Sequence, residues 1–191
     1  MKHWIVGLLL MATPAFAGEI YLYPAAAEFP SGTVCSPQVT TSSTNSYVTV
    51  DCPQNGADQH FLFHAAVPHD MNNSFQFVPT LYWKTTANSA TGNVCWDVQF
   101  AVVTTASGLR NYDTLELSAA STPNVVSTLS TASDLTSSSP ASTGLIKEDD
   151  TGCDSTCLDK PLIVWVTRLA SGSCTSDSAN VGSAVLLRLH Y

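Results

Sequence analysis

Apolar and polar residues alternate with a period of two along much of the chain. The clearest run is "NVCWDVQFAVV", residues 93–103. One face of this run carries large apolar side chains: Val94, Trp96, Val98, Phe100 and Val102. The other face carries Cys95, Asp97 and Gln99. Because successive side chains of a β-strand point to opposite sides, this pattern predicts a strand with one face in the core.

Four other runs alternate in the same way and predict strands. They are "HFLFHAAV" (60–67), "FQFVPTLYWK" (75–84), "PLIVWVTRL" (161–169) and "AVLLRLHY" (184–191). In the last run we expect the core face to hold Val185, Leu187, Leu189 and Tyr191. Shorter strand candidates lie near 20–24, 46–51, 112–118 and 124–130. These runs are rich in β-branched and aromatic residues, as strands are.

Turn-forming segments such as "PQNG", "NSATGN" and "SSSPASTG" separate the runs, and no segment has the pattern of a three-turn amphipathic helix. The polar stretch 131–144 is expected to be a long loop. The pattern therefore predicts an all-β protein, a single-domain β-sandwich or jelly roll of about 8–10 antiparallel strands that spans residues 18–191.

The first twenty residues, "MKHWIVGLLLMATPAFAGEI", have a different character. A short basic start precedes an apolar stretch, and small residues follow at Ala15 and Ala17. This order is typical of a secretory signal peptide, here residues 1–17, with cleavage after Ala17. The apolar stretch is too short to span a bilayer, so we expect no membrane insertion. The mature protein is expected to be secreted, to the cell surface, the periplasm or the medium.

Charge narrows the choice of partners. The chain has 15 acidic and 7 basic residues, a formal net charge of −8 at pH 7. Nucleic acids and anionic membranes would repel such a surface, so neither is expected as a partner.

Six cysteines follow the signal peptide: Cys35, Cys52, Cys95, Cys153, Cys157 and Cys174. An even number in an exported chain predicts three disulfides. A zinc cluster of Cys153, Cys157 and Cys174 is the alternative, although its spacing is unusual for structural zinc. Sequence does not determine connectivity, because six cysteines allow fifteen arrangements. Our working hypothesis is Cys35–Cys52, Cys95–Cys174 and Cys153–Cys157.

The segment "HFLFHAAVPHD", residues 60–70, places three histidines near Asp70. On a helix, His60 and His64 could share a metal ion, but on a strand they would be about 13 Å apart. Because the segment alternates, we interpret both as strand residues. A site made of His64, His69 and Asp70 remains an open alternative.

No motif indicates catalysis. The chain lacks the G-x-S-x-G and phosphate-loop patterns. Carboxylates that could pair in space for sugar hydrolysis are scattered: Asp51, Asp70, Asp97 and Glu116. Each is expected to be a turn or solvent-facing residue. We therefore predict a protein that is not an enzyme and that needs no cofactor, with calcium as the one exception to test.

That exception concerns the acidic segment "KEDDTGCDSTCLDK", residues 147–160. Calcium prefers oxygen ligands on a constrained loop, and Asp149, Asp150 and Asp154 would supply them. The spacing differs from that of an EF-hand, and acidic runs are commonly just solvated. Both interpretations stay open.

Two stretches resemble a known family. "AAVPHDMNNSFQFVPTLYWKTTANSATGNVCWDVQF" is similar to a turn, strand, turn and strand pattern of structural proteins from tailed phages and prophages. "LIVWVTRLASGSCTSDSANVGSAVLLRLHY" is similar to their C-terminal strands, with Arg168, Asp177 and Tyr191 at matching positions. The resemblance covers residues 60–103 and 161–191. It implies a jelly-roll building block or surface-binding module without catalytic residues, here as a secreted, disulfide-bearing relative.

Two functions follow as hypotheses. The first is a structural or adhesive subunit of a surface structure, appendage or virion-like particle, with self-assembly or a cell-surface ligand as its partner. The alternative is a carbohydrate-binding module that presents aromatic side chains to polysaccharide. Trp83 and Trp96 share the apolar phase of their strands and are expected in the core. Trp165 and Tyr82 have the opposite phase and, with Tyr112, are candidates for exposure.

Overall fold

The structure is a computed structural model. It describes residues 18–41, 46–71, 77–85, 93–102, 125–128, 136–138, 147–148, 151–152, 157–170, 172–174 and 181–191. The expected signal peptide, residues 1–17, and the strand candidate 112–118 lie outside the described residues.

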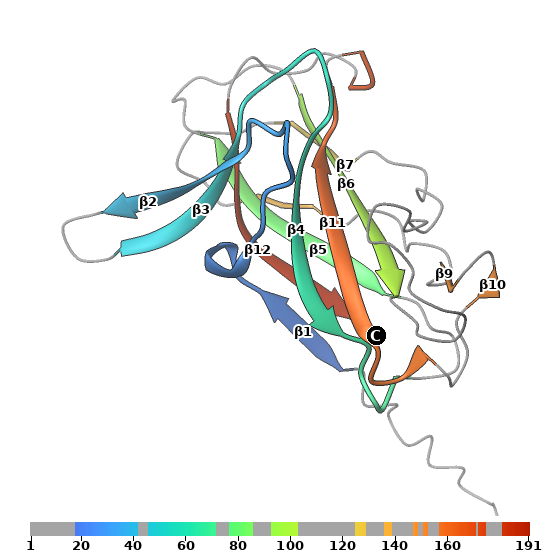
Figure 1. Ribbon diagram of the computed structural model, residues 1–191. Helices are drawn as coiled ribbons and strands as arrows, with labels where there is room; N and C mark the ends of the chain where they lie inside the picture. The colour runs from blue at the N-terminus through green and yellow to red at the C-terminus, as the bar shows by residue number, and fades with distance from the viewer. Residues whose placement is uncertain are drawn as a thin grey trace, which may run out of the picture.

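Two antiparallel sheets pack face to face in a β-sandwich (Figure 1). The strands are β1 (Glu19–Leu22), β2 (Ser36–Thr41), β3 (Ser46–Cys52), β4 (Gln59–Ala66), β5 (Val78–Thr85), β6 (Asn93–Val102), β7 (Val125–Thr128), β8 (Thr136–Ser138), β9 (Lys147–Glu148), β10 (Thr151–Gly152), β11 (Pro161–Arg168) and β12 (Gly182–His190). A 3-10 turn, η1 (Pro24–Ala26), follows β1. The all-β prediction is confirmed.

The strand order is that of a jelly roll. One sheet has the order β2-β3-β12-β5-β8, and the other has the order β4-β11-β6-β7. The pairing is nested: β3 pairs with β12, β4 with β11, β5 with β8 and β6 with β7. A long antiparallel hairpin that is wound into two sheets produces this nesting. Outside the eight nested strands, β1 pairs with β12, β2 extends one sheet, and β9 and β10 form a separate hairpin.

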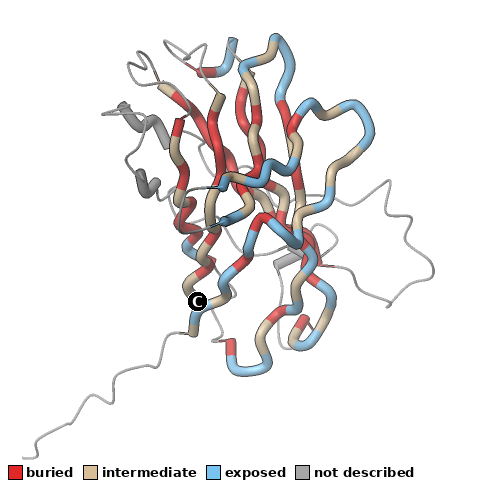
Figure 2. Tube along the Cα trace, turned by 90° about the vertical axis from the view of Figure 1, so that its left-hand side faces the viewer, coloured by how far each residue is buried: buried red, intermediate tan, exposed pale blue. Residues whose placement is uncertain are grey.

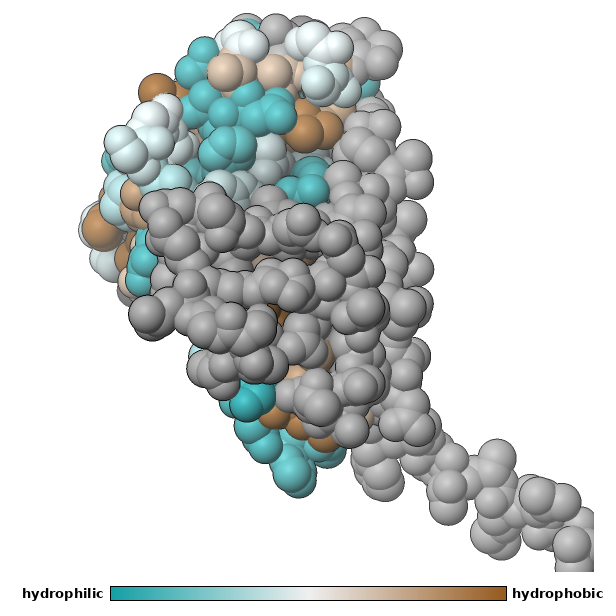
Figure 3. Space-filling model, turned by 45° about the vertical axis from the view of Figure 1, so that its right-hand side comes forward, coloured by the Kyte–Doolittle hydropathy of each residue, from teal (hydrophilic) through white to brown (hydrophobic). Residues whose placement is uncertain are grey.

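The core lies between the two sheets, as the buried positions in Figure 2 show. In the described part of 93–103, the predicted core face is confirmed, because Val94, Trp96, Val98 and Phe100 are fully buried. Cys95 and Asp97 on the opposite face are buried as well, so burial does not alternate along this strand. The largest aromatic side chains of the core are Trp83, Trp96, Phe61, Phe63, Phe77 and Phe100. On the described part of the face in Figure 3, hydrophobic residues form small patches between hydrophilic ones. Among the described residues, no helix is long and apolar enough to cross a membrane.

The structure corrects the prediction for β12. The register between β12 and β5 shifts between Ala184 and Leu186, which marks a β-bulge. Ala184, Leu187 and Leu189 are buried, whereas Val185, expected in the core, is only half-buried. A bulge inserts one residue into a strand and so shifts the alternation by one position. Val185 and Leu186 therefore both line a groove outside the core.

A second correction concerns the stretch 131–144, expected to be a loop throughout. Its residues Thr136–Ser138 form β8, which pairs with Leu81–Trp83 of β5. A short edge strand is held by backbone hydrogen bonds, so it needs no apolar alternation that a sequence pattern could reveal. The same holds for β2, whose residues have no apolar stripe.

Two disulfides connect the described residues, and both match the working hypothesis. Cys35, directly before β2, pairs with Cys52, the last residue of β3, and Cys95 pairs with Cys174. Cys157 is also disulfide-bonded. Its expected partner, Cys153, lies outside the described residues. Disulfides of this kind indicate an oxidising, extracellular type of environment.

Candidate functional surfaces

A two-stranded arm projects from the sandwich (Figure 1). Only Val50, Asp51 and Cys52 of β3 pair with β12. The first half of β3 leaves the sheet and continues to pair with β2 alone, from Thr41↔Ser46 to Gln38↔Thr49. We call residues 36–41 and 46–49 the arm. In the part of the chain that the structure describes, β2 has no strand on its other side.

The arm lacks the charges that usually protect an edge strand from pairing with another chain. No residue from 29 to 50 is charged, although the whole chain has a net charge of −8. Val39 is 71% exposed and Tyr47 is 38% exposed. Charged side chains are a common protection of edge strands, and here Pro37 is the only residue of β2 that limits edge pairing.

Two contacts hold the arm to the sandwich. The Cys35–Cys52 disulfide joins the strands at the point where β3 enters the sheet, with the two Cα atoms 4.2 Å apart. The Lys84 ammonium donates a hydrogen bond of 2.6 Å to the Tyr47 hydroxyl. The same ammonium lies 4.9 Å from the centre of the Tyr47 ring. Tyr47 pairs with Thr40 near the outer end of the arm, so one contact lies at the base of the arm and the other near its outer end.

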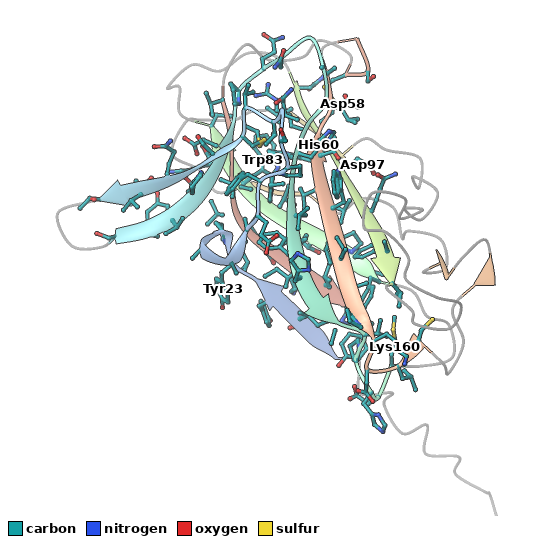
Figure 4. All side chains as sticks on the ribbon, in the orientation of Figure 1. Tyr23, Asp58, His60, Trp83, Asp97 and Lys160 are labelled. Atoms are coloured by element: carbon teal, nitrogen blue, oxygen red, sulfur yellow. A yellow bond between two sulfur atoms is a disulfide. The ribbon has the colours of Figure 1, made fainter. Side chains whose placement is uncertain are left out.

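An apolar groove of about 320 Å³ lies beside the arm. We call it the arm groove. Tyr47 and Val48 of the arm form one side, and Tyr23, Pro24 and Ala25 form another. The β12 bulge supplies the rest, because it turns two consecutive apolar residues, Val185 and Leu186, toward the groove. Tyr23, labelled in Figure 4, is 58% exposed.

A different candidate surface is the outer face of the β4-β11-β6 sheet. The register places nine outward side chains in three rows that each cross the three strands. The rows are His60, Thr167 and Asp97; then Leu62, Trp165 and Gln99; then His64, Ile163 and Ala101. Trp165 is therefore at the centre of the face and is partly exposed, as its phase predicted.

A groove of about 430 Å³ runs beside Trp165. We call it the Trp165 groove. Leu62, Ile163 and Trp165 contribute from the sheet. The segment Glu28, Phe29 and Pro30 forms a wall, which is fixed because Glu28 and Leu62 exchange two backbone hydrogen bonds of 2.9 and 3.0 Å. His64 completes the groove, and its Nε2 lies 3.2 Å from a Glu28 carboxylate oxygen.

Polar residues gather at the end of this face near Asp58, His60 and Asp97 (Figure 4). His60 Nδ1 lies 3.4 Å from the Thr167 hydroxyl. Burial lowers the pKa of His60, while the charge of Asp58 acts in the opposite direction. Burial raises the pKa of Asp97; the Val98 backbone opposes this shift and the charge of Asp58 adds to it.

This polar group does not have the order of a nucleophile relay. In such a relay the imidazole lies between the hydroxyl and the carboxylate. Here Thr167 is the middle residue of the row, between His60 and Asp97. Asp58 accepts a hydrogen bond of 2.7 Å from the backbone of Ala170.

The alternative metal site of His64, His69 and Asp70 is not assembled. His64 contacts Glu28, His69 contacts Asp159 at 2.8 Å, and Asp70 accepts a hydrogen bond of 3.0 Å from the Tyr191 hydroxyl. Hydrogen bonding to Asp159 raises the pKa of His69. Within the described ranges, no group of three or more His, Cys, Asp or Glu side chains could hold a metal ion.

Other predicted residues have different positions. Asp51 accepts a hydrogen bond of 2.9 Å from the Thr49 hydroxyl. Asp97, expected in a turn or facing solvent, lies within β6 and is only 5% exposed, so that expectation is wrong. Tyr82 is half-buried, with the Arg188 guanidinium 6.0 Å from its ring centre. The calcium candidates Asp149, Asp150 and Asp154 lie outside the described residues, as do Glu116, Tyr112 and Asp177.

Among the residues of these surfaces that were not predicted are Glu28, Asp58 and Leu186. Glu28 and Asp58 lie in connecting segments, where no periodic pattern marks a residue. Leu186 lies beside a bulge. Comparison with known proteins adds no assignment, since no family model and no curated protein matches the chain. The fold and its disulfides define the class: a disulfide-bonded β-jelly-roll protein.

Proposed function

We propose that this chain is an exported, non-catalytic jelly-roll subunit that assembles with copies of itself into a surface structure. The observation that carries the proposal is the arm, a projecting pair of strands with an uncharged free edge. An exposed edge strand offers unpaired backbone groups to a strand of another chain. Two arms that pair edge to edge would extend each sheet into the next subunit.

Charge favours a second copy as the partner that meets the arm. Two molecules with a net charge of −8 repel each other over most of their surfaces. The arm is the long segment where this repulsion is weakest, since residues 29–50 carry no charge. The adjacent arm groove adds apolar area that a partner's Val39 could cover. Apolar contact and strand pairing would then act together.

The resemblance to phage structural proteins supports a role as a building block. Its two stretches, 60–103 and 161–191, contain β4, β5, β6, β11 and β12. These strands are neighbours in the two sheets and form most of the core. The arm lies outside the resembling stretches, so the resemblance supports the jelly-roll body while the arm argument is independent of it.

The test is the oligomeric state of the exported protein. We expect light scattering and sedimentation to show concentration-dependent association, and negative-stain microscopy to show regular particles or filaments. Val39→Glu places a charge on the free edge and should shift the midpoint of association to at least about tenfold higher concentration. Val78→Glu introduces the same charge at another exposed valine, outside the arm, and is the matched control.

Two results would contradict the proposal. A wild-type protein that remains monomeric at the highest attainable concentration would exclude self-assembly. Equal effects of Val39→Glu and Val78→Glu would show that association does not use the arm. Thermal unfolding of both variants checks that each is folded.

A further inference from the structure

We propose that the Trp165 groove binds a neutral carbohydrate, with a sugar ring stacked on the indole of Trp165. This site lies on the sheet formed by β4, β11 and β6, whereas the arm leaves the other sheet. The inference is therefore independent of the proposed assembly.

The first argument is the position of Trp165. A large aromatic side chain on the outward phase of a central strand is normally a cost, because its apolar surface meets water. Trp165 lies on β11, which is flanked on both sides by β4 and β6, and it remains partly exposed. The indole is also held in place: the His60 ring lies 5.4 Å away, centre to centre, and His60 in turn contacts Thr167. An oriented, accessible ring needs little ordering when a ligand stacks on it.

The second argument is the combination of groups around the ring. The groove has a volume of about 430 Å³, within the range of about 300–1,000 Å³ that is usual for small-ligand sites. Glu28 and His64 lie at its polar side and contact each other at 3.2 Å. Their side chains are 65% and 42% exposed, so they can exchange this contact for hydrogen bonds to a ligand. A carboxylate accepts hydrogen bonds, and an imidazole nitrogen donates or accepts them.

These features select a ligand with an apolar face and hydroxyl groups at its edge. A sugar ring has both, since its C–H groups form a flat apolar face and its hydroxyls donate and accept hydrogen bonds. An anionic ligand would be repelled by Glu28 and by the net charge of −8. A purely apolar ligand could not form hydrogen bonds with the Glu28 and His64 side chains. A cationic ligand is the main competitor, because a carboxylate and an indole also attract cations.

Tryptophan fluorescence gives a readout specific to this site. The chain has four tryptophans. Trp4 precedes the expected cleavage site, and Trp83 and Trp96 are fully buried. In exported protein that begins at Gly18, acrylamide should therefore quench Trp165 selectively. Trp165→Phe should abolish the quenchable component, which confirms the assignment before any ligand is added.

The binding experiment uses cellohexaose, maltohexaose, xylohexaose, laminarihexaose and chitohexaose as probes. At least one should protect Trp165 from acrylamide at millimolar concentration and bind with a 1:1 stoichiometry in calorimetry. Trp165→Ala should weaken binding at least about tenfold, and Glu28→Gln should weaken it by about threefold or more. Trp165→Phe keeps an aromatic face and should have intermediate affinity. Tyr82→Ala, an aromatic residue on the other sheet, should bind as the wild type does.

Three outcomes would overturn the inference. The first is that no hexasaccharide protects Trp165. The second is that a sugar binds Trp165→Ala or Glu28→Gln as tightly as the wild type, which would place the sugar elsewhere. The third is that tetramethylammonium protects Trp165 better than every sugar does, which would identify a cation site. Because Trp165→Phe and Glu28→Gln are mild substitutions, the test does not depend on whether Trp165→Ala folds.

Discussion

Trp83 of β5 and Trp96 of β6 meet between the two sheets, with ring centres 6.3 Å apart. Neither side chain is exposed to solvent. Phe61 of β4 packs edge-on against Trp96, with ring centres 6.4 Å apart. Three strands from both sheets therefore meet at Trp96, and the contact joins the two layers of the sandwich.

Trp96→Ala should lower the free energy of unfolding by about 3–5 kcal/mol, the usual loss when a large aromatic is removed from a core. Against a typical total of about 5–15 kcal/mol, this loss is severe and should also reduce the exported yield. Chemical denaturation measures the difference. Trp165→Ala, on the outer face, is the control and should cost less. An unchanged midpoint for Trp96→Ala would show that Trp96 is not part of the core.

Gly182 packs directly against the same ring. A Cβ atom on Gly182 would lie 2.9 Å from Cζ2 of Trp96 and 3.0 Å from Cγ1 of Val94. Both neighbours are fully buried and cannot move freely. Gly182→Ala should therefore destabilise the protein by about 1–3 kcal/mol, as overpacking does. Gly56→Ala is the control, because no atom lies within 4 Å of the added Cβ. Equal stabilities of the two variants would contradict this packing.

The Cys35–Cys52 disulfide should stabilise both the fold and the orientation of the arm. The two cysteines are 17 residues apart in sequence. Closing a loop of this length contributes about 3 kcal/mol. Replacing both cysteines with alanine should cost about that amount and should increase hydrogen exchange in residues 36–41. The same replacement of Cys95 and Cys174, a separation of 79, should cost more but leave exchange in the arm unchanged. Faster exchange in both variants would mean that the arm is not held by its own disulfide.

Because the Asp97 carboxyl has a raised pKa, we expect the free energy of unfolding to depend on pH. Its pKa is raised above the ordinary value of 3.8, mainly by burial. Within the window between 3.8 and the raised pKa, the folded protein binds more protons than the unfolded chain, so stability falls as pH rises. Asp97→Asn removes this titration and should unfold at a higher urea concentration than the wild type at pH 7. The difference in the urea midpoint between Asp97→Asn and the wild type should become smaller as the pH is lowered toward 3. A difference that is constant over this range would show that Asp97 titrates normally.

The mature protein should begin at Gly18 and contain no free thiol. The backbone of Gly18 exchanges two hydrogen bonds of 3.1 Å with Tyr191. A Cβ atom at this position would lie 2.0 Å from Cζ of the Tyr191 ring, so a larger residue would displace that ring. Intact mass, with and without alkylation before reduction, measures both features. A mass that includes Met1, or alkylation without a reductant, would contradict the prediction.

Much of the sandwich follows from the sequence alone. A strand with one buried face must alternate apolar and polar residues, and 60–67, 93–103 and 161–169 do so. The same pattern placed Trp96 in the core and Trp165 on the outer face, because the two have opposite phases in their strands. Cysteine count and the basic and apolar start of the chain likewise predict export with disulfides, through chemistry that does not depend on the fold.

Several features depend on the tertiary structure and are not encoded in the local pattern of apolar and polar residues. Strand β2 is held by backbone hydrogen bonds to β3, the next strand along the chain, and β8 by backbone hydrogen bonds to β5, which is distant in sequence. Because backbone bonds hold both strands, neither needs an apolar stripe. The β12 bulge shifts alternation by one position, and it turned Val185 from an expected core residue into part of the arm groove. Glu28 meets His64 because a connecting segment crosses the edge of β4. Contacts of this kind depend on how the sheets fold together, because the local sequence around each residue does not indicate its partner.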